Sequence, residues 1–493
     1  MNHPRLNNVS PVELMRDIFV RQQHASRSRE MITYRERVAA LDILLDGIFN
    51  YENALVSALN MDFNSRSTHE TRLLEIFPLV DEIRYIKRHL RRWMRPQSVP
   101  VNWQYRPSRA RIMYQPLGVV GVIGAWNYQI LLTLSPLVNA LAAGNRVIVK
   151  PSELAPATAE VIQRMIGEIF QPDHVAVVTG GAEVAAALAA LPLDHLIFTG
   201  STRVGKLVMK AAAENLTPVT LELGGKSPAL VHESYSIPLA ADRICSAKFW
   251  NGGQTCVAPD YVLAPAQKIE EFVQSSMQII SRRFPRLLGG DYTHMINEAA
   301  WQRMHELIED ARNKGAQIHQ INPANEHLTA ENRAFAPTLV VGANDSMRLM
   351  QEEIFGPILP IVTHTSLDEA IQQINARPRP LALYYFDADP QRIDHLLQHT
   401  VSGGVTVNDC IHHLVQHSLP FGGIGPSGMG AYHGFDGFET FSKKKGVLIQ
   451  NPLVGSVLGR LTKPPYDIWS ERLIDFLLAR KRSADKDRDV SAR

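Results

Sequence analysis

The first part of the chain carries a helical pattern of apolar positions. Over residues 11–93, apolar side chains recur at three- and four-residue spacing among many charged ones, as in Leu41, Leu44, Leu45 and Ile48. This spacing gathers the apolar side chains on one face of a helix. We therefore predict amphipathic helices over this segment.

The pattern changes to strict alternation over residues 99–114. Val101, Trp103 and Tyr105 would lie on one face of a strand, and a proline and a serine at 107–108 would form a turn before a second strand. Alternation on both sides of a turn predicts a β-hairpin that interrupts the helices.

Short apolar runs then alternate with helical stretches. Strands that alternate with helices are typical of a parallel sheet with helices on both faces. The first series of runs comprises 119–123, 146–149, 175–178, 195–198 and 219–223. After a helical stretch near 298–313, the second series comprises 338–341, 358–362, 381–386 and 404–407. We predict an α/β fold with two such domains.

Length, charge and cysteine content exclude several classes of protein. A chain of 493 residues exceeds the size at which one hydrophobic core stops growing. A net charge of +2 gives no reason to expect nucleic acid or a membrane surface as a partner. No run reaches the ~18 apolar residues of a membrane helix, and the N-terminus lacks the apolar centre of a secretory signal. Three cysteines without a Cys-x-x-Cys pair indicate a reducing compartment, so we expect a cytoplasmic location.

Cys256 is the candidate nucleophile. It ends the glycine-rich turn Asn251-Gly-Gly-Gln-Thr-Cys256, where its thiol can face a cleft. A free thiol has a pKa of ~8.5, so attack as thiolate requires a base or a lowered pKa. The alternative is a buried structural cysteine, which is what we expect of Cys245 and Cys410.

Glu222 is the candidate base. It lies in an otherwise apolar strand that ends in two glycines, within Thr220-Leu-Glu-Leu-Gly-Gly-Lys226. Burial would raise the pKa of this carboxyl group toward neutrality and suit it to general base catalysis. The structural alternative is a salt bridge with Lys226 or another cation.

Two segments are candidates for holding a dinucleotide. Residues 198–205 follow a predicted strand and open a helix, so backbone N–H groups and the hydroxyl of Ser201 could receive a pyrophosphate. Their spacing is not Gly-x-Gly-x-x-Gly, and a tight connection is the alternative. Upstream, Lys150 and Glu153 end another strand and could hold a ribose diol, with a capped turn as the alternative.

Seven motifs in one order resemble the aldehyde dehydrogenase superfamily over residues 114–441. They are Gly-Ala-Trp-Asn127, Lys150-Pro-Ser-Glu153, Phe-Thr-Gly-Ser201, Glu222-Leu-Gly-Gly-Lys, Gly-Gln-Thr-Cys256, Glu353-Ile-Phe-Gly-Pro357 and Pro420-Phe-Gly-Gly. Finer motifs resemble the class 3 branch and, within it, the coniferyl aldehyde dehydrogenase group. These are Cys256-Val-Ala-Pro-Asp-Tyr261, Arg379-Pro-Leu-Ala-Leu-Tyr384, Gly428-Met-Gly-Ala-Tyr-His-Gly434 and Lys463-Pro-Pro-Tyr466.

The resemblance implies two Rossmann-like α/β domains and a β-hairpin bridging element through which two subunits pair as a homodimer. A solvent-facing flap is the alternative for the hairpin. The implied divisions are an NAD(P)-binding domain at 1–92 and 113–224, a catalytic domain at 225–424, the bridging element at 93–112 and 441–452, and a C-terminal tail at 453–493.

The resemblance also implies the chemistry. Cys256 would attack an aldehyde, Asn127 would hold the oxyanion, and Glu222 would activate the water that hydrolyses the thioester. The cofactor would be NAD, with NADP accepted. The implied cofactor-binding residues are Trp126, Lys150, Glu153, Gly200, Ser201, Gly205, Glu353 and Phe355.

For the substrate we expect a hydrophobic aldehyde, aromatic or arylpropenal such as coniferaldehyde, with medium- or long-chain aliphatic aldehydes as the alternative. Apolar and aromatic side chains near the candidate site favour this expectation, although core packing is their alternative role. They are Tyr114, Trp126, Tyr128, Phe249 and Trp250.

One departure from the family pattern and two rival interpretations remain to be considered. Gln129 occupies the position, two after Asn127, where the family usually has proline, so the rigidity of that loop is open. A metal site is a rival function, but its residues lack a second ligand cluster, and we expect no metal. Its candidate ligands are Cys410, His412, His413 and His417. A catalytically inactive homologue is the third possibility, and the joint presence of nucleophile, base and oxyanion asparagine argues against it.

Overall fold

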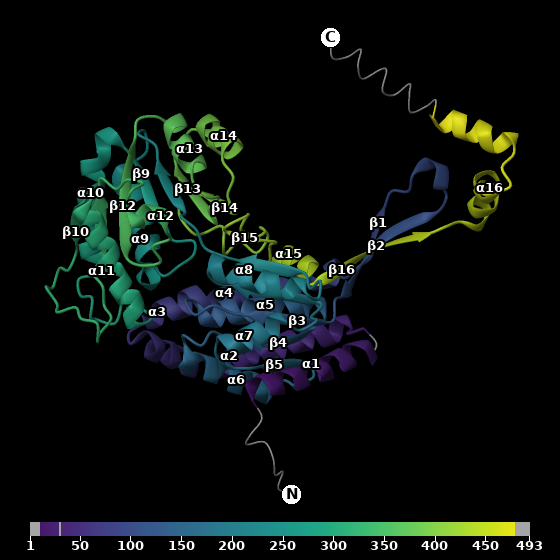
Figure 1. The fold of residues 1–493 in the computed structure, drawn as a ribbon, viewed down its shortest axis with the longest axis horizontal. Helices are drawn as coiled ribbons and strands as arrows, with labels where there is room; N and C mark the ends of the chain where they lie inside the picture. The colour runs from purple at the N-terminus through teal and green to yellow at the C-terminus, as the bar shows by residue number, and fades with distance from the viewer. Residues whose placement is uncertain (1–9, 29–30, 479–493) are drawn as a thin grey trace, which may run out of the picture. The chain divides into compact units, whose positions relative to one another are not determined.

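The computed structural model describes residues 10–28 and 31–478. Its contacts divide the chain into two compact units (Figure 1). The first combines Met1–Trp93 with Pro116–Ser442, and the second combines Met94–Gln115 with Lys443–Arg493. Part of the predicted C-terminal tail, from 479 onward, lies outside the described residues.

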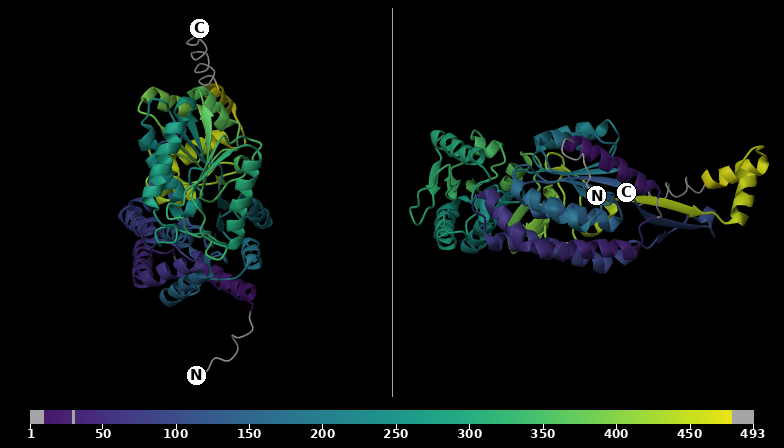
Figure 2. Two further views of the ribbon diagram at one scale, coloured as in Figure 1. Left: turned by 90° about the vertical axis from the view of Figure 1, so that its left-hand side faces the viewer. Right: turned by 90° about the horizontal axis from the view of Figure 1, so that it is seen from below.

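The N-terminal segment is helical, as its periodicity predicts. The helices are α1 (Pro11–Ser28), α2 (Tyr34–Phe63), α3 (Thr68–Thr71) and α4 (Phe77–Trp93), with a π-helical turn η1 (Arg72–Ile76) between the last two. Helix α2 begins at a capping box formed by Thr33 and Glu36 and ends at Asn64, which has a left-handed φ of 62°. Helices α1 and α2, purple in Figures 1 and 2, pack against the first sheet and its covering helices.

The first sheet follows the order β15-β7-β6-β3-β4-β5. Its strands are β3 (Val119–Ile123), β4 (Arg146–Lys150), β5 (Val175–Val177), β6 (His195–Thr199), β7 (Val219–Glu222) and β15 (Gly428–Met429). All pairs are parallel except β15, which returns late in the chain and runs antiparallel to β7. The five predicted runs are confirmed as strands. Helices α5 (Gln129–Ala143), α6 (Pro156–Ile169), α7 (Ala182–Ala189) and α8 (Thr202–Ala213) connect them.

The second sheet follows the order β10-β11-β12-β9-β8-β13-β14. Its strands are β8 (Pro228–Val231), β9 (Tyr261–Pro265), β10 (Gln317–Gln320), β11 (Thr338–Val341), β12 (Ile358–His364), β13 (Ala382–Phe386) and β14 (Gly404–Val407). The four predicted runs are confirmed, and the prediction missed β8, β9 and β10. The helices of this part are α9 (Ile237–Phe249), α10 (Ile269–Arg283), α11 (Glu298–Asn313), α12 (Arg348–Gln351), α13 (Leu367–Asn375), α14 (Pro390–His399) and α15 (Gly434–Thr440).

The second unit contains the predicted hairpin with a different first strand. Strand β1 (Gln97–Val99) pairs antiparallel with β2 (Arg109–Pro116), and β16 (Ser442–Ile449) completes the order β1-β2-β16. The prediction of a strand through Trp103 and Tyr105 was wrong, because these residues form a 3-10 turn. Pro100 explains the early end of β1, since proline cannot donate a hydrogen bond to a sheet ladder. Helix α16 (Pro452–Thr462) follows β16.

Within the described residues, every helix is too short or too polar to cross a membrane.

Candidate active site

A cavity of about 760 Å³ lies at the carboxyl ends of strands in the first sheet. Open α/β sheets bind ligands at this edge, because loops and helix N-termini meet there. The predicted site residues that line the cavity are Asn127, Trp126, Lys150, Glu153, Gly200, Ser201, Glu222, Cys256, Glu353 and Phe355. Loops and helices that adjoin both sheets therefore contribute to one cavity.

Gly205 is the predicted site residue that does not line the cavity. It lies in the second turn of α8, where a Cβ atom would meet Leu223 Cδ2 at 2.8 Å. The absence of a side chain lets α8 approach the end of β7 closely. Gly205 thus acts on the position of the helix and does not face the cavity.

Glu222 ends β7 and is 3% exposed. Neither of its carboxylate oxygens has a hydrogen-bond partner among the described residues, and burial raises the pKa of this carboxyl group well above its ordinary value. The expected alternative, a salt bridge with Lys226, is wrong. The ammonium group of Lys226 instead pairs with Asp260 and donates to the carbonyl of Leu349 at 2.6 Å. Glu222 is therefore available to a ligand or a water molecule.

Cys256 follows a tight 3-10 turn, η3 (Trp250–Gly253). Gly252 and Gly253 have φ angles of 58° and 76°, and a Cβ at Gly253 would meet the carbonyl oxygen of Gly356 at 2.3 Å. Only glycine fits such a left-handed, crowded backbone. The turn leaves Cys256 part-exposed at the cavity.

The protonation state of Cys256 calls for a base. Burial raises the pKa of its thiol to about 12, and the nearby carboxyl groups of Glu353 and Glu222 raise it further. The thiol is consequently protonated at neutral pH until a base or a cation acts on it. Cys245 and Cys410 are fully buried away from the cavity, as expected of structural cysteines.

Asn127 lies in the loop between β3 and α5 and is 3% exposed. Its amide nitrogen Nδ2 donates to the carbonyl of Gln254 at 3.1 Å, which orients the group and leaves its second N–H for another acceptor. The loop is anchored although Gln129 replaces the usual proline. Gln129 is fully buried and its Nε2 donates to the carbonyl of Ala155 at 2.7 Å.

The far end of the cavity offers charge and hydrogen bonds suited to a dinucleotide. Ser201 is the N-cap of α8, where unpaired backbone N–H groups favour an anion. Lys150 and Glu153 form an ion pair at the cavity wall. Arg203, in the first turn of α8, adds a positive charge to the lining.

The part of the cavity near Cys256 combines a polar and an aromatic group. Oε1 of Glu353 is buried without a partner in the described structure, and burial, reinforced by Asp260, raises the pKa of this carboxyl group to about 8. Phe355 has a left-handed φ of 52°, and its ring lies 5.4 Å from that of Trp126. A carboxyl group with one unpartnered oxygen beside two aromatic rings fits a ribose and a planar ring.

The sequence did not single out all the lining residues. Leu154, Ala182, Ala185, Leu207 and Arg303 belong to no motif, although they line the cavity. Arg303, from α11, donates to the main-chain carbonyls of Ile354 at 2.5 Å and Glu353 at 2.7 Å, so it holds the loop that carries Glu353. No local pattern announces such a contact, because it joins segments far apart in the chain.

The aromatic residues expected near the substrate divide between two roles. Trp126 lines the cavity, whereas Phe249 is completely buried in the core. Tyr128 is 8% exposed, and its hydroxyl group hydrogen-bonds to that of Thr255 at 2.7 Å. Tyr128 therefore supports the turn before Cys256.

The rival metal site does not form. In the described parts of the chain, no three His, Cys, Asp or Glu side chains gather as metal ligands would. His413 hydrogen-bonds to Thr406 at 2.8 Å, and His417 bonds to Asp81 at 3.1 Å. Residues 411–419 form turns and bends, so His413 and His417 do not share the face of a helix.

Comparison with known proteins tests the resemblance. A model of the aldehyde dehydrogenase family matches residues 15–447. The chain belongs to the aldehyde dehydrogenase family. It is therefore an oxidoreductase that acts on aldehydes with NAD or NADP.

Individual relatives indicate the branch of the family that this aldehyde dehydrogenase resembles. It is 47% identical over 464 residues to a probable coniferyl aldehyde dehydrogenase of Pseudomonas aeruginosa, a match that covers 94% of this chain and 96% of that one. It is 39% identical over 448 residues to aldehyde dehydrogenase family 3 member A2 of Mus musculus, which covers 90% of each chain. Both matches confirm the expected class 3 and coniferyl resemblance.

A solved structure confirms the fold. The substrate-bound structure of Staphylococcus aureus AldH superposes with a TM-score of 0.88 at 35% identity and covers 94% of this chain and 99% of that one. The aldehyde dehydrogenase fold predicted from the motifs is thus the observed one.

Proposed function

We propose that this aldehyde dehydrogenase oxidises an aromatic or arylpropenal aldehyde, such as coniferaldehyde, to its carboxylic acid with NAD. The observation that carries the proposal is one cavity whose lining contains a cysteine thiol, an unpaired buried carboxyl group and residues suited to binding a dinucleotide. These groups are the ones that thioester chemistry requires.

In the first step the thiol of Cys256 gives up its proton to water in the cavity. The sulfur attacks the aldehyde carbon, and the carbonyl oxygen becomes an alkoxide. The free N–H of the Asn127 amide and the backbone N–H of Cys256 stabilise that charge. The dinucleotide, when bound, supplies the acceptor for the hydride that leaves this carbon. The carbon then remains joined to Cys256 as a thioester.

In the second step Glu222 removes a proton from a water molecule, which attacks the thioester carbon. The bond to sulfur breaks, the acid leaves, and Cys256 returns to its thiolate form. Burial raises the pKa of the Glu222 carboxyl group well above its ordinary value, which makes its carboxylate a stronger base. Because Glu222 has no partner among the described residues, it can activate water, which favours transfer of the acyl group to water over transfer to another acceptor.

Several residues support a dinucleotide and, among dinucleotides, NAD. The N-terminus of α8 with Ser201 and Gly200 would hold the pyrophosphate, and Glu353 with Phe355 and Trp126 would hold the nicotinamide end. Lys150 and Glu153 would bind the adenosine ribose. The carboxylate of Glu153 accepts hydrogen bonds from a 2′-hydroxyl group and repels a 2′-phosphate, which favours NAD over NADP.

The relatives support the aromatic substrate, since one is named a probable coniferyl aldehyde dehydrogenase. A panel of coniferaldehyde, benzaldehyde, octanal and succinic semialdehyde, each with NAD and with NADP, tests the proposal by kcat/KM. The Cys256→Ala protein serves as the blank. We expect coniferaldehyde with NAD to give the highest value. A preference for octanal would favour the aliphatic alternative, and a preference for the charged semialdehyde or strict dependence on NADP would contradict the proposal.

A further inference from the structure

A buried ion pair lies behind the cavity, outside its lining. Arg66 follows α2, and Glu75 lies in the π-helical turn η1. Both side chains are completely buried, and an oxygen of Glu75 lies 2.8 Å from Nη2 of Arg66. Removing two charged side chains from water costs free energy, so specific contacts must hold them in place.

Arg66 is held by one hydrogen bond, by the ion pair and by two aromatic rings. Its Nη1 donates to the main-chain carbonyl of Asn127 at 2.8 Å. Its guanidinium carbon lies 4.8 Å from the ring centre of Phe63 and 5.1 Å from that of Tyr128. Together with the ion pair, this hydrogen bond and the two ring contacts restrict the planar guanidinium to one orientation.

Glu75 extends this grip to the next helix. Its second oxygen accepts hydrogen bonds from the backbone N–H groups of Ile130 at 2.8 Å and Leu131 at 3.2 Å. These are the second and third residues of α5, whose N-cap residue, Tyr128, makes no side-chain capping bond. The carboxylate therefore caps α5 from another segment. Asn127 is thus held at its own carbonyl group and at the start of the helix that follows it.

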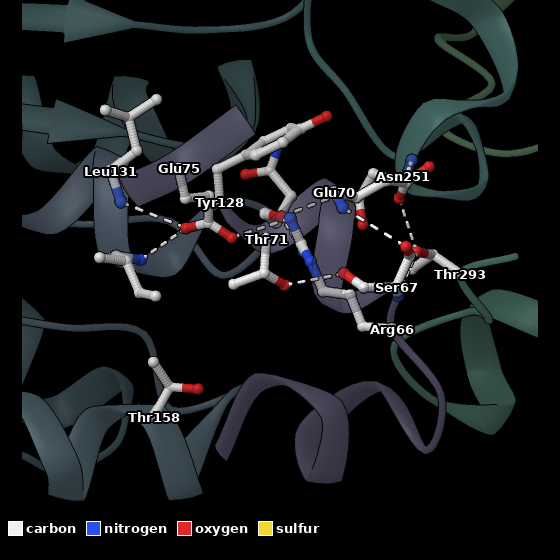
Figure 3. Close-up of polar contacts among 12 residues, drawn as sticks. Arg66, Ser67, Glu70, Thr71, Glu75, Tyr128, Leu131, Thr158, Asn251 and Thr293 are labelled. Carbon is white, nitrogen blue, oxygen red and sulfur yellow. Dashed lines mark hydrogen bonds and ion pairs between the residues drawn. The ribbon is translucent and has the colours of Figure 1, made fainter. Parts of the chain in front are cut away.

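A second acid ties the nucleophile turn to the same asparagine. Glu70 accepts hydrogen bonds from the backbone N–H of Asn251 at 3.0 Å and from the hydroxyl of Thr293 at 2.7 Å (Figure 3). The side chain of Asn251 donates to the carbonyls of Asn127 at 2.9 Å and Gln254 at 3.1 Å. The loop that carries Asn127 and the turn before Cys256 therefore belong to one hydrogen-bond network.

We propose that Arg66 is a positioning residue for the oxyanion site: paired with Glu75, it fixes the Asn127 loop so that the amide of Asn127 faces the alkoxide formed at Cys256. The inference rests on the proposed function. Buried ion pairs often add little to stability compared with apolar side chains of similar size. The contacts of this pair instead converge on the one loop whose orientation matters for charge stabilisation.

The test compares Arg66→Met with a matched control. Arg37 is also buried, and its Nη1 donates to the carbonyl of Ala142 at 3.0 Å, near the opposite end of α5. We expect Arg66→Met to lower kcat and the burst rate of reduced cofactor by about 10- to 100-fold, because misplaced catalytic groups cost rate on that scale. The Kd for NAD should stay within about 2-fold of the original, because Arg66 itself lies outside the lining of the cavity. We expect Arg37→Met to retain kcat even where it lowers Tm.

A double-mutant cycle separates positioning from general damage. If Arg66 acts through the amide of Asn127, Arg66→Met has no further effect on kcat in an Asn127→Ala background. Multiplying effects of the two substitutions, or an unchanged kcat in Arg66→Met, would overturn the proposal. Glu75→Gln keeps the size of the side chain and removes the charge, so it repeats the test if Arg66→Met does not fold.

The same experiments distinguish failure of the proposed function. An original enzyme that oxidises no aldehyde in the panel would refute that function. An active enzyme that needs Asn127 but is indifferent to Arg66 and Glu75 would refute only the positioning role.

Discussion

The environment of Glu222 combines two properties that seldom occur together in a protein interior. The carboxyl group is buried, and it lacks a partner among the described residues. Buried acids are usually paired, because an isolated charge in a low-dielectric site is costly. The cost is tolerable here because the group can hold its proton until a reaction requires the base.

The first prediction concerns this base in turnover. We expect Glu222→Gln to form the thioester and release a burst of reduced cofactor, because hydride departure precedes the step that needs the base. Steady-state turnover should then fall by about 10²- to 10⁴-fold, the usual contribution of a general base. Stopped-flow absorbance at the reduced nicotinamide band measures both phases. Intact NAD binding without a burst would give Glu222 an earlier role, such as deprotonation of Cys256.

The same substitution has a predicted effect on stability. The pKa of Glu222 is raised in the folded state above its ordinary value of 4.5, so the folded protein binds this proton more tightly than the unfolded chain. Stability from this group is therefore fully present below pH 4.5 and is lost as pH rises toward the folded-state pKa. Glu222→Gln removes that loss. We expect thermal denaturation to show that the Tm of Glu222→Gln rises relative to that of the original protein between about pH 5 and about pH 8. A Tm difference that does not change with pH would argue against the raised pKa of Glu222.

The three cysteines give the next prediction. Cys256 lines the cavity, whereas Cys245 and Cys410 are buried elsewhere and burial raises the pKa of each thiol. We expect Cys256→Ala to lower kcat by about 10⁴-fold or more, as loss of a covalent nucleophile does. Cys245→Ala and Cys410→Ala should keep most activity and lose roughly 0.5–3 kcal/mol of stability. An equal loss of activity at Cys410 would refute the assignment of the nucleophile.

At the scale of elements, most buried parallel strands were predicted, but β8 and β9 were missed although they are also buried and parallel. Strands such as β3 and β4 are buried on both faces, so their sequences contain continuous runs of apolar residues. Strand β10 escaped prediction because it is a half-exposed edge strand of sequence Gln-Ile-His-Gln. Its assignment depends on pairing with β11, which no local pattern contains.

The site shows the same division. Motifs identified Cys256, Glu222 and Asn127 because their chemistry is unusual for their surroundings. Arg66 and Glu75 were missed because an arginine or a glutamate in a charged helical segment normally faces solvent. Their burial follows from the packing of η1 against the start of α5, and sequence periodicity does not encode that contact.

The position of helix α8 gives a prediction at this scale. A Cβ at Gly205 would meet the side chain of Leu223 at 2.8 Å, so Gly205→Ala should displace either that side chain or the N-terminus of α8. Helix N-termini contribute up to about 2 kcal/mol to anion binding, so we expect the Kd for NAD to rise by up to about 30-fold. Titration of protein fluorescence with NAD measures it.

Gly167 in α6 is the matched control for this substitution. Nothing lies within 4 Å of its Cβ position. Gly167→Ala should therefore leave the Kd unchanged and raise stability by roughly 0.5–1 kcal/mol through helix propensity. An equal effect of both substitutions on NAD binding would contradict the role given to the close approach of α8.

At the scale of the whole molecule, the second unit raises the question of assembly. Its sheet has the order β1-β2-β16, so β1 and β16 are edge strands of the described sheet. Exposed edges and exposed apolar side chains are features that proteins usually cover or protect. On β16, Leu448 and Ile449 are 55% and 49% exposed. Together with the family resemblance of this element, these features favour pairing of two chains through the second unit.

The last prediction follows from that surface. We expect the chain to sediment at twice its 55.0 kDa mass, and Leu448→Glu to weaken the dimer by about 2 kcal/mol or more, or roughly 30-fold in Kd, because a charge would be buried at the interface. Leu397 in α14 is 42% exposed and lies in the first unit, so Leu397→Glu is the matched control and should leave the mass unchanged. Sedimentation over a range of protein concentrations measures both variants. A dimer that resists Leu448→Glu but dissociates with Leu397→Glu would move the interface to the first unit, and a monomer at all concentrations would mean that the hairpin and β16 form a solvent-facing flap.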